Sequence, residues 1–174
     1  TALGIAYTPV GVMIDERSFV NGIIGLHATG GSTNLAIHII AMAAAAGIKL
    51  TWADFSDLSD ATPLLARVYP NGSADVNHFH AAGGMGFLIR ELLGVGLLHA
   101  DVRTVGGPDL HAYTREPVLA GGELTWRDAP AVSGDDSVLR RVVRFFESEG
   151  FEVVGVDRVA PHLLAGTGAL GRIQ

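Results

Sequence analysis

The chain has 174 residues, a length that fits one domain, or one domain and a small part of another. Hydrophobic residues make up 48% of the sequence, which is enough for a core and excludes general disorder. The formal net charge is −6 at pH 7 and no cluster of Lys and Arg stands out, so no nucleic-acid partner is indicated. Cysteine is absent, which excludes disulfides and thiolate-held metals or iron–sulfur clusters within this chain.

No targeting segment is recognisable, because the N-terminal residues do not combine a basic stretch with an apolar one. The longest apolar stretch, Leu35–Leu50, contains His38 and Lys49 and lacks the character of a membrane span. We therefore expect a cytoplasmic protein with no membrane partner. The abrupt start at Thr1, without an initiator Met, is typical of a fragment.

Two helices are predicted first in the chain. One opens at Asp15 or Ser18 and runs to about Leu26, with apolar residues at helical spacing. The other spans about Thr33–Ala46 and is closed by Gly47. Its alanine-rich surface favours close packing in a core.

A capping box and a strand are predicted next. Thr51 and Asp54 have the spacing of a capping box, here with Asp in the Glu position, for a short helix to about Leu58. The apolar residues of Pro63–Tyr69 favour a strand, and a turn follows from Pro70.

The middle of the chain predicts two helical segments that glycines separate. Asp75 is placed to cap the first helix. Gly83, Gly84 and Gly86 interrupt this helix, and a second one is predicted over Phe87–Leu93. A strand is expected over Val102–Val105, and a small hairpin around the two glycines at 121–122.

The last part of the chain predicts an amphipathic helix over Ser137–Glu149 and a strand over Phe151–Val156. Helices that alternate with short apolar strands indicate the α/β class. We expect layered helices around a short, mostly parallel sheet, as a fragment of a larger domain.

A glycine turn is the most informative stretch of the sequence. Residues 28–38 read Ala-Thr-Gly-Gly-Ser-Thr-Asn-Leu-Ala-Ile-His, and Ser32, Thr33 and Asn34 are preferred residues for starting a helix. The free N–H groups of such a start attract phosphate or carboxylate. In the alternative interpretation, a hydroxyl only caps the helix while the glycines make a tight turn. The stretch is neither a P-loop nor a dinucleotide fingerprint.

Two histidines form the second candidate site, beside Asn77. In a helix, His78 and His80 point to different faces, whereas in an extended segment they share one face and could hold a metal with Asp75. Imidazole also suits substrate binding or proton transfer near neutral pH. Metal ligation, substrate hydrogen bonding and purely structural roles all stay open at this point.

Other ionisable residues have simpler interpretations. His27 and His38 flank the glycine turn, and His38 is expected to be a core residue with its polar atoms satisfied. Three carboxylates, at Asp54, Asp57 and Asp60, share a helix face by their spacing. A solvated face is the expected role of that acidic set, rather than a metal site.

Seven segments together resemble one known family. They lie at residues 7–11, 15–21, 28–34, 50–60, 68–72, 74–93 and 113–117. The match is to the dihydroxy-acid and 6-phosphogluconate dehydratase family, and it runs almost without gaps from Thr1 to about Arg140. Gly-Gly-Ser-Thr-Asn is shared by the wider family, whereas Tyr-Pro-Asn-Gly and Asp-Val-Asn-His-Phe-His are typical of its phosphogluconate branch.

The resemblance implies a hydro-lyase, which removes water from 6-phospho-D-gluconate to give 2-keto-3-deoxy-6-phosphogluconate in the Entner–Doudoroff pathway. It also implies a homodimer, a 4Fe–4S cluster acting as Lewis acid and often a divalent cation such as Mg²⁺. Ser32, Thr33 and Asn34 would then contact an anionic group of this sugar-acid phosphate. The candidates near the sugar are Asn77, His78 and His80, and no catalytic residue is assigned.

The chain also departs from the family. The cluster cysteines lie upstream of the matched region in the family and a β-rich domain lies downstream, so residues 1–137 resemble the later part of the first, α/β domain. We expect the chain to be inactive alone. Residues 138–174 instead resemble part of UDP-2,3-diacylglucosamine pyrophosphatase. The alternatives are therefore a non-catalytic α/β binding or assembly module, or a fragment of a lipid A pathway pyrophosphatase.

Overall fold

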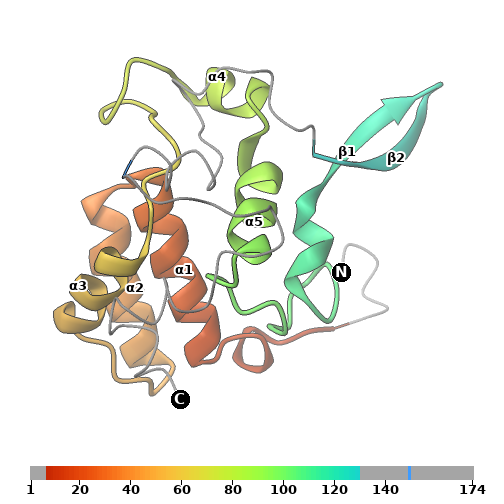
Figure 1. The fold of residues 1–174 in the computed structure, drawn as a ribbon. Coiled ribbons are helices and arrows are strands. Elements are labelled where there is room, and N and C mark those ends of the chain that lie inside the picture. The colour runs from red at the N-terminus through yellow and green to blue at the C-terminus, as the bar shows by residue number, and fades with distance from the viewer. Residues whose placement is uncertain (1–6, 130–148, 150–174) are drawn as a thin grey trace.

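The computed structural model describes residues 7–129 and 149. Helices dominate these residues, and the strands form one antiparallel hairpin. Figure 1 shows α1, α2 and α3 grouped together, with α5 beside α1 and the hairpin projecting from the helices. The elements in chain order are η1 (Val10–Val12), α1 (Glu16–Thr29), α2 (Thr33–Ala45), α3 (Trp52–Ala61), α4 (Val76–Ala81), α5 (Gly84–Gly94), η2 (Leu110–Thr114), β1 (Arg115–Ala120) and β2 (Glu123–Asp128).

Helix α1 begins at a complete capping box, which confirms the first predicted helix. The Asp15 carboxylate accepts the Ser18 backbone N–H at 3.0 Å, while the Ser18 hydroxyl accepts the Asp15 N–H at 3.3 Å. The helix ends at Gly30, whose φ of 57° is a left-handed conformation that favours glycine. It therefore continues about one turn beyond the predicted end at Leu26.

One hydrophobic core joins α1, α2, α3 and α5. The largest fully buried side chains come from α1, from α5 and from the segment after α3, and they are Ile23, Ile24, Leu65, Phe87, Leu88 and Leu92. The backbone N–H groups of Leu65 and Ala66 both donate to the Ala28 carbonyl, at 2.8 and 2.9 Å. These two bonds hold the segment after α3 against the end of α1, next to the glycine turn.

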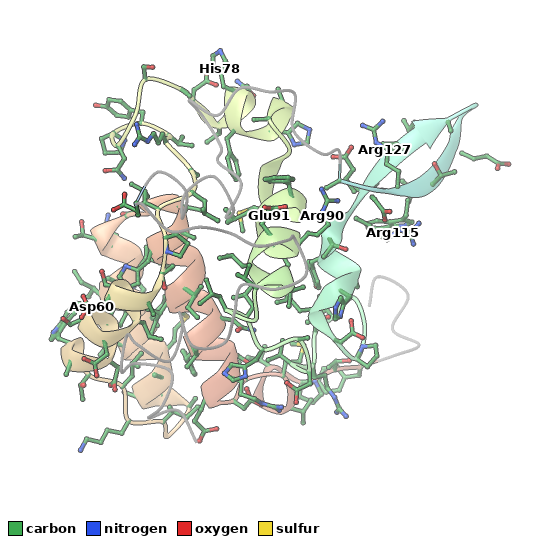
Figure 2. The ribbon with its side chains drawn as sticks, viewed as in Figure 1. Asp60, His78, Arg90, Glu91, Arg115 and Arg127 are labelled. Atoms are coloured by element: carbon green, nitrogen blue, oxygen red, sulfur yellow. The ribbon has the colours of Figure 1, made fainter. Side chains whose placement is uncertain are left out.

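Helix α5 begins at Gly84, earlier than the predicted start at Phe87. A Cβ on Gly86 would lie 2.8 Å from the Cβ of Ala129, so the glycine permits a close approach of α5 to the end of the hairpin. Arg90 reinforces this contact, because its guanidinium donates to the Ala129 carbonyl at 2.6 Å (Figure 2).

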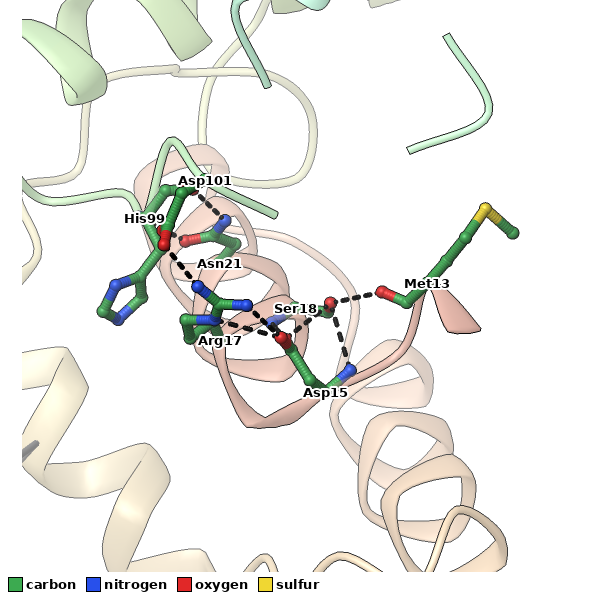
Figure 3. Close-up of polar contacts among 7 residues, drawn as sticks. All are labelled: Met13, Asp15, Arg17, Ser18, Asn21, His99 and Asp101. Carbon is green, nitrogen blue, oxygen red and sulfur yellow. Dashed lines mark hydrogen bonds and ion pairs between the residues drawn. The ribbon is translucent and has the colours of Figure 1, made fainter. Parts of the chain in front are cut away.

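A polar clasp joins α1 to the segment that follows α5 (Figure 3). The Asn21 amide donates to the His99 carbonyl at 2.9 Å and accepts the His99 backbone N–H at 2.9 Å. Arg17 bonds the Asp15 carboxylate at 2.6 Å and also pairs with Asp101. The Asn21 pair satisfies backbone groups that are 78 positions away in the sequence.

We expect Asn21→Ala to lower the free energy of unfolding by about 1–3 kcal/mol, because the His99 N–H and carbonyl lose their partner together. Urea unfolding followed by circular dichroism measures this change. Arg17→Ala is the control, since its ion pairs are partly exposed to solvent and should contribute less. A larger loss of unfolding free energy in Arg17→Ala than in Asn21→Ala would contradict the claim that the Asn21 hydrogen bonds contribute most to this contact.

The predicted strands before residue 110 are not strands. Within Pro63–Tyr69 and Val102–Val105, the bridges are isolated ones, from Val68 to Ala74 and from Thr104 to Gly107. The backbone N–H groups of Leu65 and Ala66, which a β-ladder would use, donate to the Ala28 carbonyl at the end of α1. The expected mostly parallel sheet is therefore not found in residues 7–129.

The hairpin and the remaining helices agree with the sequence. β1 pairs antiparallel with β2 around two glycines with φ of 60° and 86°, as predicted. Thr51 and Asp54 form the predicted capping box of α3, which runs to Ala61 instead of Leu58. Asp75 caps α4, also as predicted.

Several sequence predictions lie outside the described residues. They are the helix over Ser137–Glu149, apart from Glu149 itself, the strand over Phe151–Val156 and the boundary between residues 137 and 138. In the part of the chain that is described, no helix combines the length and apolar character that a membrane crossing requires.

Candidate functional site

The glycine turn connects α1 directly to α2. Ser32 is the N-cap of α2, and its hydroxyl accepts the Asn34 backbone N–H at 3.1 Å. Ser32, Thr33 and Asn34 are all exposed. Among the described residues, the backbone N–H groups of Ser32 and Thr33 bond no other protein atom. The predicted helix start is therefore present, and the backbone N–H groups of Ser32 and Thr33 are available to a ligand.

Two cavities flank this turn, and the residues from Gly30 to Thr33 line both of them. The first has a volume of about 420 Å³ and lies towards α3. Its other lining residues are Leu26, His27, Ala36, Trp52, Phe55, Ser56, Ser59 and Asp60. The second has a volume of about 510 Å³ and lies towards α4, with Thr29, Ala66, Val68, Tyr69, Pro70, Asn71, Val76 and Phe79 as its other lining residues.

The two cavities differ in charge. The carboxylate of Asp60, on α3 in Figure 2, borders the first cavity and disfavours an anion there. His27 also lines this cavity, but its Nε2 lies 3.1 Å from the Phe55 carbonyl and is already engaged. No acidic residue is among the described residues that line the second cavity. The second cavity is therefore the better setting for an anionic group.

Sequence reasoning missed Asn71 as a residue of this site. Its side-chain amide donates to the Gly30 carbonyl, although the two residues are 41 positions apart. The Pro-Asn-Gly sequence indicated only a turn, and no local signal placed that turn against the glycines. Asn71 therefore ties one wall of the second cavity to the turn itself.

Helix α4 carries the second group of predicted site residues. Val76 and Phe79 line the second cavity, whereas Asn77, His78 and His80 line neither cavity. His78 projects outward from α4 (Figure 2) and its Nδ1 lies 2.8 Å from the Asp75 carboxylate. The structure thus brings α4 to the glycine turn but does not point these three side chains into it.

The metal interpretation of the two histidines required an extended segment, and the structure has a helix there. His78 and His80 consequently do not share a face. Across residues 7–129, no three His, Asp or Glu side chains are grouped closely enough to hold a metal ion.

Asp75 gives α4 a pH-dependent cap. The backbone N–H of His78 donates to its carboxylate at 3.0 Å, which holds the pKa of Asp75 below the ordinary value of 3.8. Because the folded-state pKa is the lower one, the cap contributes fully above 3.8 and is lost as the pH falls through that lower value.

We therefore expect the backbone amide chemical shifts of Asn77 and His78 to titrate with a midpoint below 3.8. Nuclear magnetic resonance spectra recorded from about pH 6 to about pH 2 measure the midpoint. The matched control is Asp75→Asn, which keeps an acceptor oxygen and removes the titrating group. A midpoint at or above 3.8, or an unchanged titration in Asp75→Asn, would contradict this cap.

The other ionisable candidates divide into one confirmation and one correction. The side chains of Asp54, Asp57 and Asp60 are exposed, as expected of a solvated face. The expectation that His38 is a core residue is wrong, because it is exposed on α2. Among the described residues, the buried residues of α2 are Ala36, Ile39 and Ala43, and the half-buried Ile40 packs against the same core.

Residues 5–113, more than half of the chain, match the family described as Dihydroxy-acid/6-phosphogluconate dehydratase N-terminal. The chain belongs to this dehydratase family. The match contains the glycine turn, both cavities and α4, whereas the hairpin lies beyond it.

Relatives in this dehydratase family are similar over most of the chain. The phosphogluconate dehydratase of Rhizobium meliloti is 63% identical over 151 residues, which cover 86% of this chain and 25% of the relative. The phosphogluconate dehydratase of Pseudomonas aeruginosa is 56% identical over 144 residues, which cover 83% of this chain and 24% of the relative. The phosphogluconate dehydratase of Escherichia coli K12 is 55% identical over 150 residues, which cover 86% of this chain and 25% of the relative. The chain spans about a quarter of the length of these curated relatives.

The donor set of this dehydratase segment does not fit an iron–sulfur cluster. Such clusters are held mainly by cysteine thiolates, and the sequence contains no cysteine. The part of the fold that this chain does supply is the exposed helix start of α2 and the cavity beside it.

Proposed function

We propose that the chain is a segment of a phosphogluconate dehydratase, a hydro-lyase that converts 6-phospho-D-gluconate to 2-keto-3-deoxy-6-phosphogluconate in the Entner–Doudoroff pathway. The observation that carries this proposal is the 63% identity to a phosphogluconate dehydratase over 151 residues. The identity covers a quarter of that relative, so the activity belongs to the longer protein.

The role of this segment in the proposed enzyme is to bind an anionic group of the substrate. Ser32 and Thr33 would contact its phosphate or carboxylate from within the second cavity. Asn34 lines neither cavity and would reach the group only from the edge. The proposal is supported by the free N–H groups of the turn and by the absence of acidic residues from that cavity's described lining. A helix start stabilises an anion by about 0.3–2 kcal/mol, so it would orient the group while cations elsewhere in the enzyme supply further affinity.

The polar residues of α4 have a less direct place in the proposal. Asn77, His78 and His80 would lie near the sugar, because α4 borders the second cavity through Val76 and Phe79. Their side chains would reach the substrate at the edge of the cavity, since they do not line its wall.

The remaining features of the enzyme would come from the longer protein. A 4Fe–4S cluster would be held by residues outside this segment, because the segment has no cysteine. A divalent cation such as Mg²⁺ would also be present in the longer enzyme. We accordingly propose that the isolated chain is inactive. The longer enzyme is proposed to be a cytoplasmic homodimer.

The test is Ser32→Ala in a full-length phosphogluconate dehydratase that carries this segment. We expect the KM for 6-phosphogluconate to rise about 10-fold with a smaller change in kcat. The variant loses the hydroxyl proton that would be donated to the anion, and it loses the oxygen that accepts the Asn34 backbone N–H. Steady-state kinetics measure both constants.

Ser59→Ala is the matched control, because Ser59 lines only the first cavity. Its KM should equal that of the parent enzyme. A parental KM in Ser32→Ala, or an equal rise in both variants, would remove the assignment of the anion to the second cavity.

A further inference from the structure

A groove between α1 and α5, two helices that lie side by side in Figure 1, has no role in the proposed function. Its volume is about 410 Å³, and its walls include Gly25 of α1, Leu35 at the start of α2, and Leu88 and Ile89 of α5. A Cβ added to Gly25 would meet no atom within 4 Å, so there is room for another side chain above this part of α1.

This α1–α5 groove offers an occupant only apolar contacts. Among the described residues that line it, Asn21 and Thr29 alone have polar side chains. The Asn21 amide already bonds the His99 backbone, and the Thr29 hydroxyl donates to the Gly25 carbonyl at 2.7 Å. A polar ligand would therefore lose water here without gaining a hydrogen bond, whereas apolar side chains gain by leaving water.

Residues 137–149 have the pattern of a segment that fills such a groove. The sequence predicts an amphipathic helix there, and at 3.6 residues per turn its apolar residues fall on one side. They are Val138, Leu139, Val142, Val143, Phe145 and Phe146. The arginines at 140, 141 and 144 fall on the other side and would stay in water while the apolar side is buried.

The preceding part of the chain ends beside one wall of the groove. Ala129 is buried against α5, where the Arg90 guanidinium donates to its carbonyl at 2.6 Å. Seven residues separate Ala129 from Ser137, and seven extended residues reach about 23–25 Å. A helix with its side chains is about 10–12 Å across, so this linker is long enough to pass around α5.

The same segment belongs to the part of the chain that resembles known dehydratases. Similarity to the Rhizobium meliloti phosphogluconate dehydratase covers 86% of the 174 residues. A continuous stretch of that length includes residues 137–149 wherever it begins. The segment therefore accompanies the described helices in that enzyme.

We propose that residues 137–149 bind the α1–α5 groove through their apolar side. The missing side chain of Gly25 provides the space, and Leu88 and Ile89 provide the facing wall. Thr29 and Leu35 line the groove and flank the glycine turn, so the bound segment would also stabilise the turn. The inference does not depend on the proposed substrate contacts.

The test uses the 174-residue chain, which has no cysteine of its own. Leu35→Cys places a thiol in the groove, and Met42→Cys places one on the same helix outside it. The two native side chains are 41% and 48% exposed, so a large difference in reactivity would reveal an additional cover. We expect Leu35→Cys to react with N-ethylmaleimide about 10-fold more slowly than Met42→Cys, as measured by mass spectrometry.

Val142→Asp should abolish this protection, because it places a charge on the apolar side of the segment. Arg141→Asp is the matched control, since it introduces the same side chain on the other side and should preserve the protection. Equal rates in Leu35→Cys and Met42→Cys would overturn the proposal. Protection that survives Val142→Asp, or that disappears on dilution because a second copy is the occupant, would also overturn it.

Gly25→Leu tests the same contact if Leu35→Cys impairs folding. Leucine favours a helix more than glycine does, so an empty groove predicts a higher midpoint of urea unfolding. We expect a lower midpoint, because the added side chain would displace the bound segment. Gly94→Leu is the control, since Gly94 lies in α5 outside the groove with open space around it, and its midpoint should not fall. A higher midpoint in Gly25→Leu would overturn the proposal.

Discussion

Gly30→Ala is expected to lower the free energy of unfolding by about 2–5 kcal/mol. Gly30 has a φ of 57°, which costs an L-residue about 1–2 kcal/mol. A Cβ there would also lie 3.1 Å from Leu64 and would collide with the Asn71 side chain, and such overpacking costs about 1–3 kcal/mol. Urea unfolding of the chain measures the sum.

Gly47→Ala separates the two costs. Gly47 has a φ of 76°, but an added Cβ would meet no atom within 4 Å, so only the backbone cost of about 1–2 kcal/mol applies. Equal destabilisation of the two variants would show that Asn71 does not press on the turn. The comparison therefore tests whether the segment after α3 shapes the proposed anion site.

The second large effect is expected from Phe87→Ala, which should lower the free energy of unfolding by about 3–5 kcal/mol. Phe87 is 1% exposed and belongs to the core that joins α5 to α1. Its removal leaves a cavity that neighbouring side chains fill only partly. Denaturant unfolding followed by fluorescence or circular dichroism gives the change.

Met85→Ala is the control for this prediction because Met85 lies on the same helix and is 48% exposed. Its effect should stay within about 1 kcal/mol, since little buried area is lost. If Met85→Ala destabilised the chain as much as Phe87→Ala, the core would not be centred on the buried face of α5.

Local signals in the sequence predicted the helix starts well. Asp15, the pair of Thr51 and Asp54, and Asp75 each cap a helix through bonds that span only two or three residues. The hairpin was predicted for the same reason, because its two turn glycines lie between the paired strands. Interactions of this range are determined by neighbouring residues and can be interpreted without a fold.

The predicted strands before residue 110 failed because their backbone partners are remote. The N–H groups of Leu65 and Ala66 bond the Ala28 carbonyl, a pairing that no local pattern indicates. The alanine-rich composition of α2 predicted core packing, but the described residues cover only its stripe towards α1.

The candidate site was predicted in part. The glycine turn and the Ser32 cap follow from their own sequence, and the structure has both. Asn71 and the second cavity depend on a contact across 41 positions and were not predictable. The directions of the His78 and His80 side chains depend on whether residues 76–81 form a helix or an extended segment. The sequence allowed both, and the structure has a helix.

The central claim is that the glycine turn binds an anionic group of the substrate. A crystal structure of the full-length enzyme carrying this segment, with 6-phosphogluconate bound, tests it most directly. We predict a phosphate or carboxylate oxygen at about 2.7–3.2 Å from the Thr33 backbone N–H nitrogen or the Ser32 hydroxyl, within the second cavity. A substrate bound elsewhere, with the turn covered by other side chains, would contradict the claim.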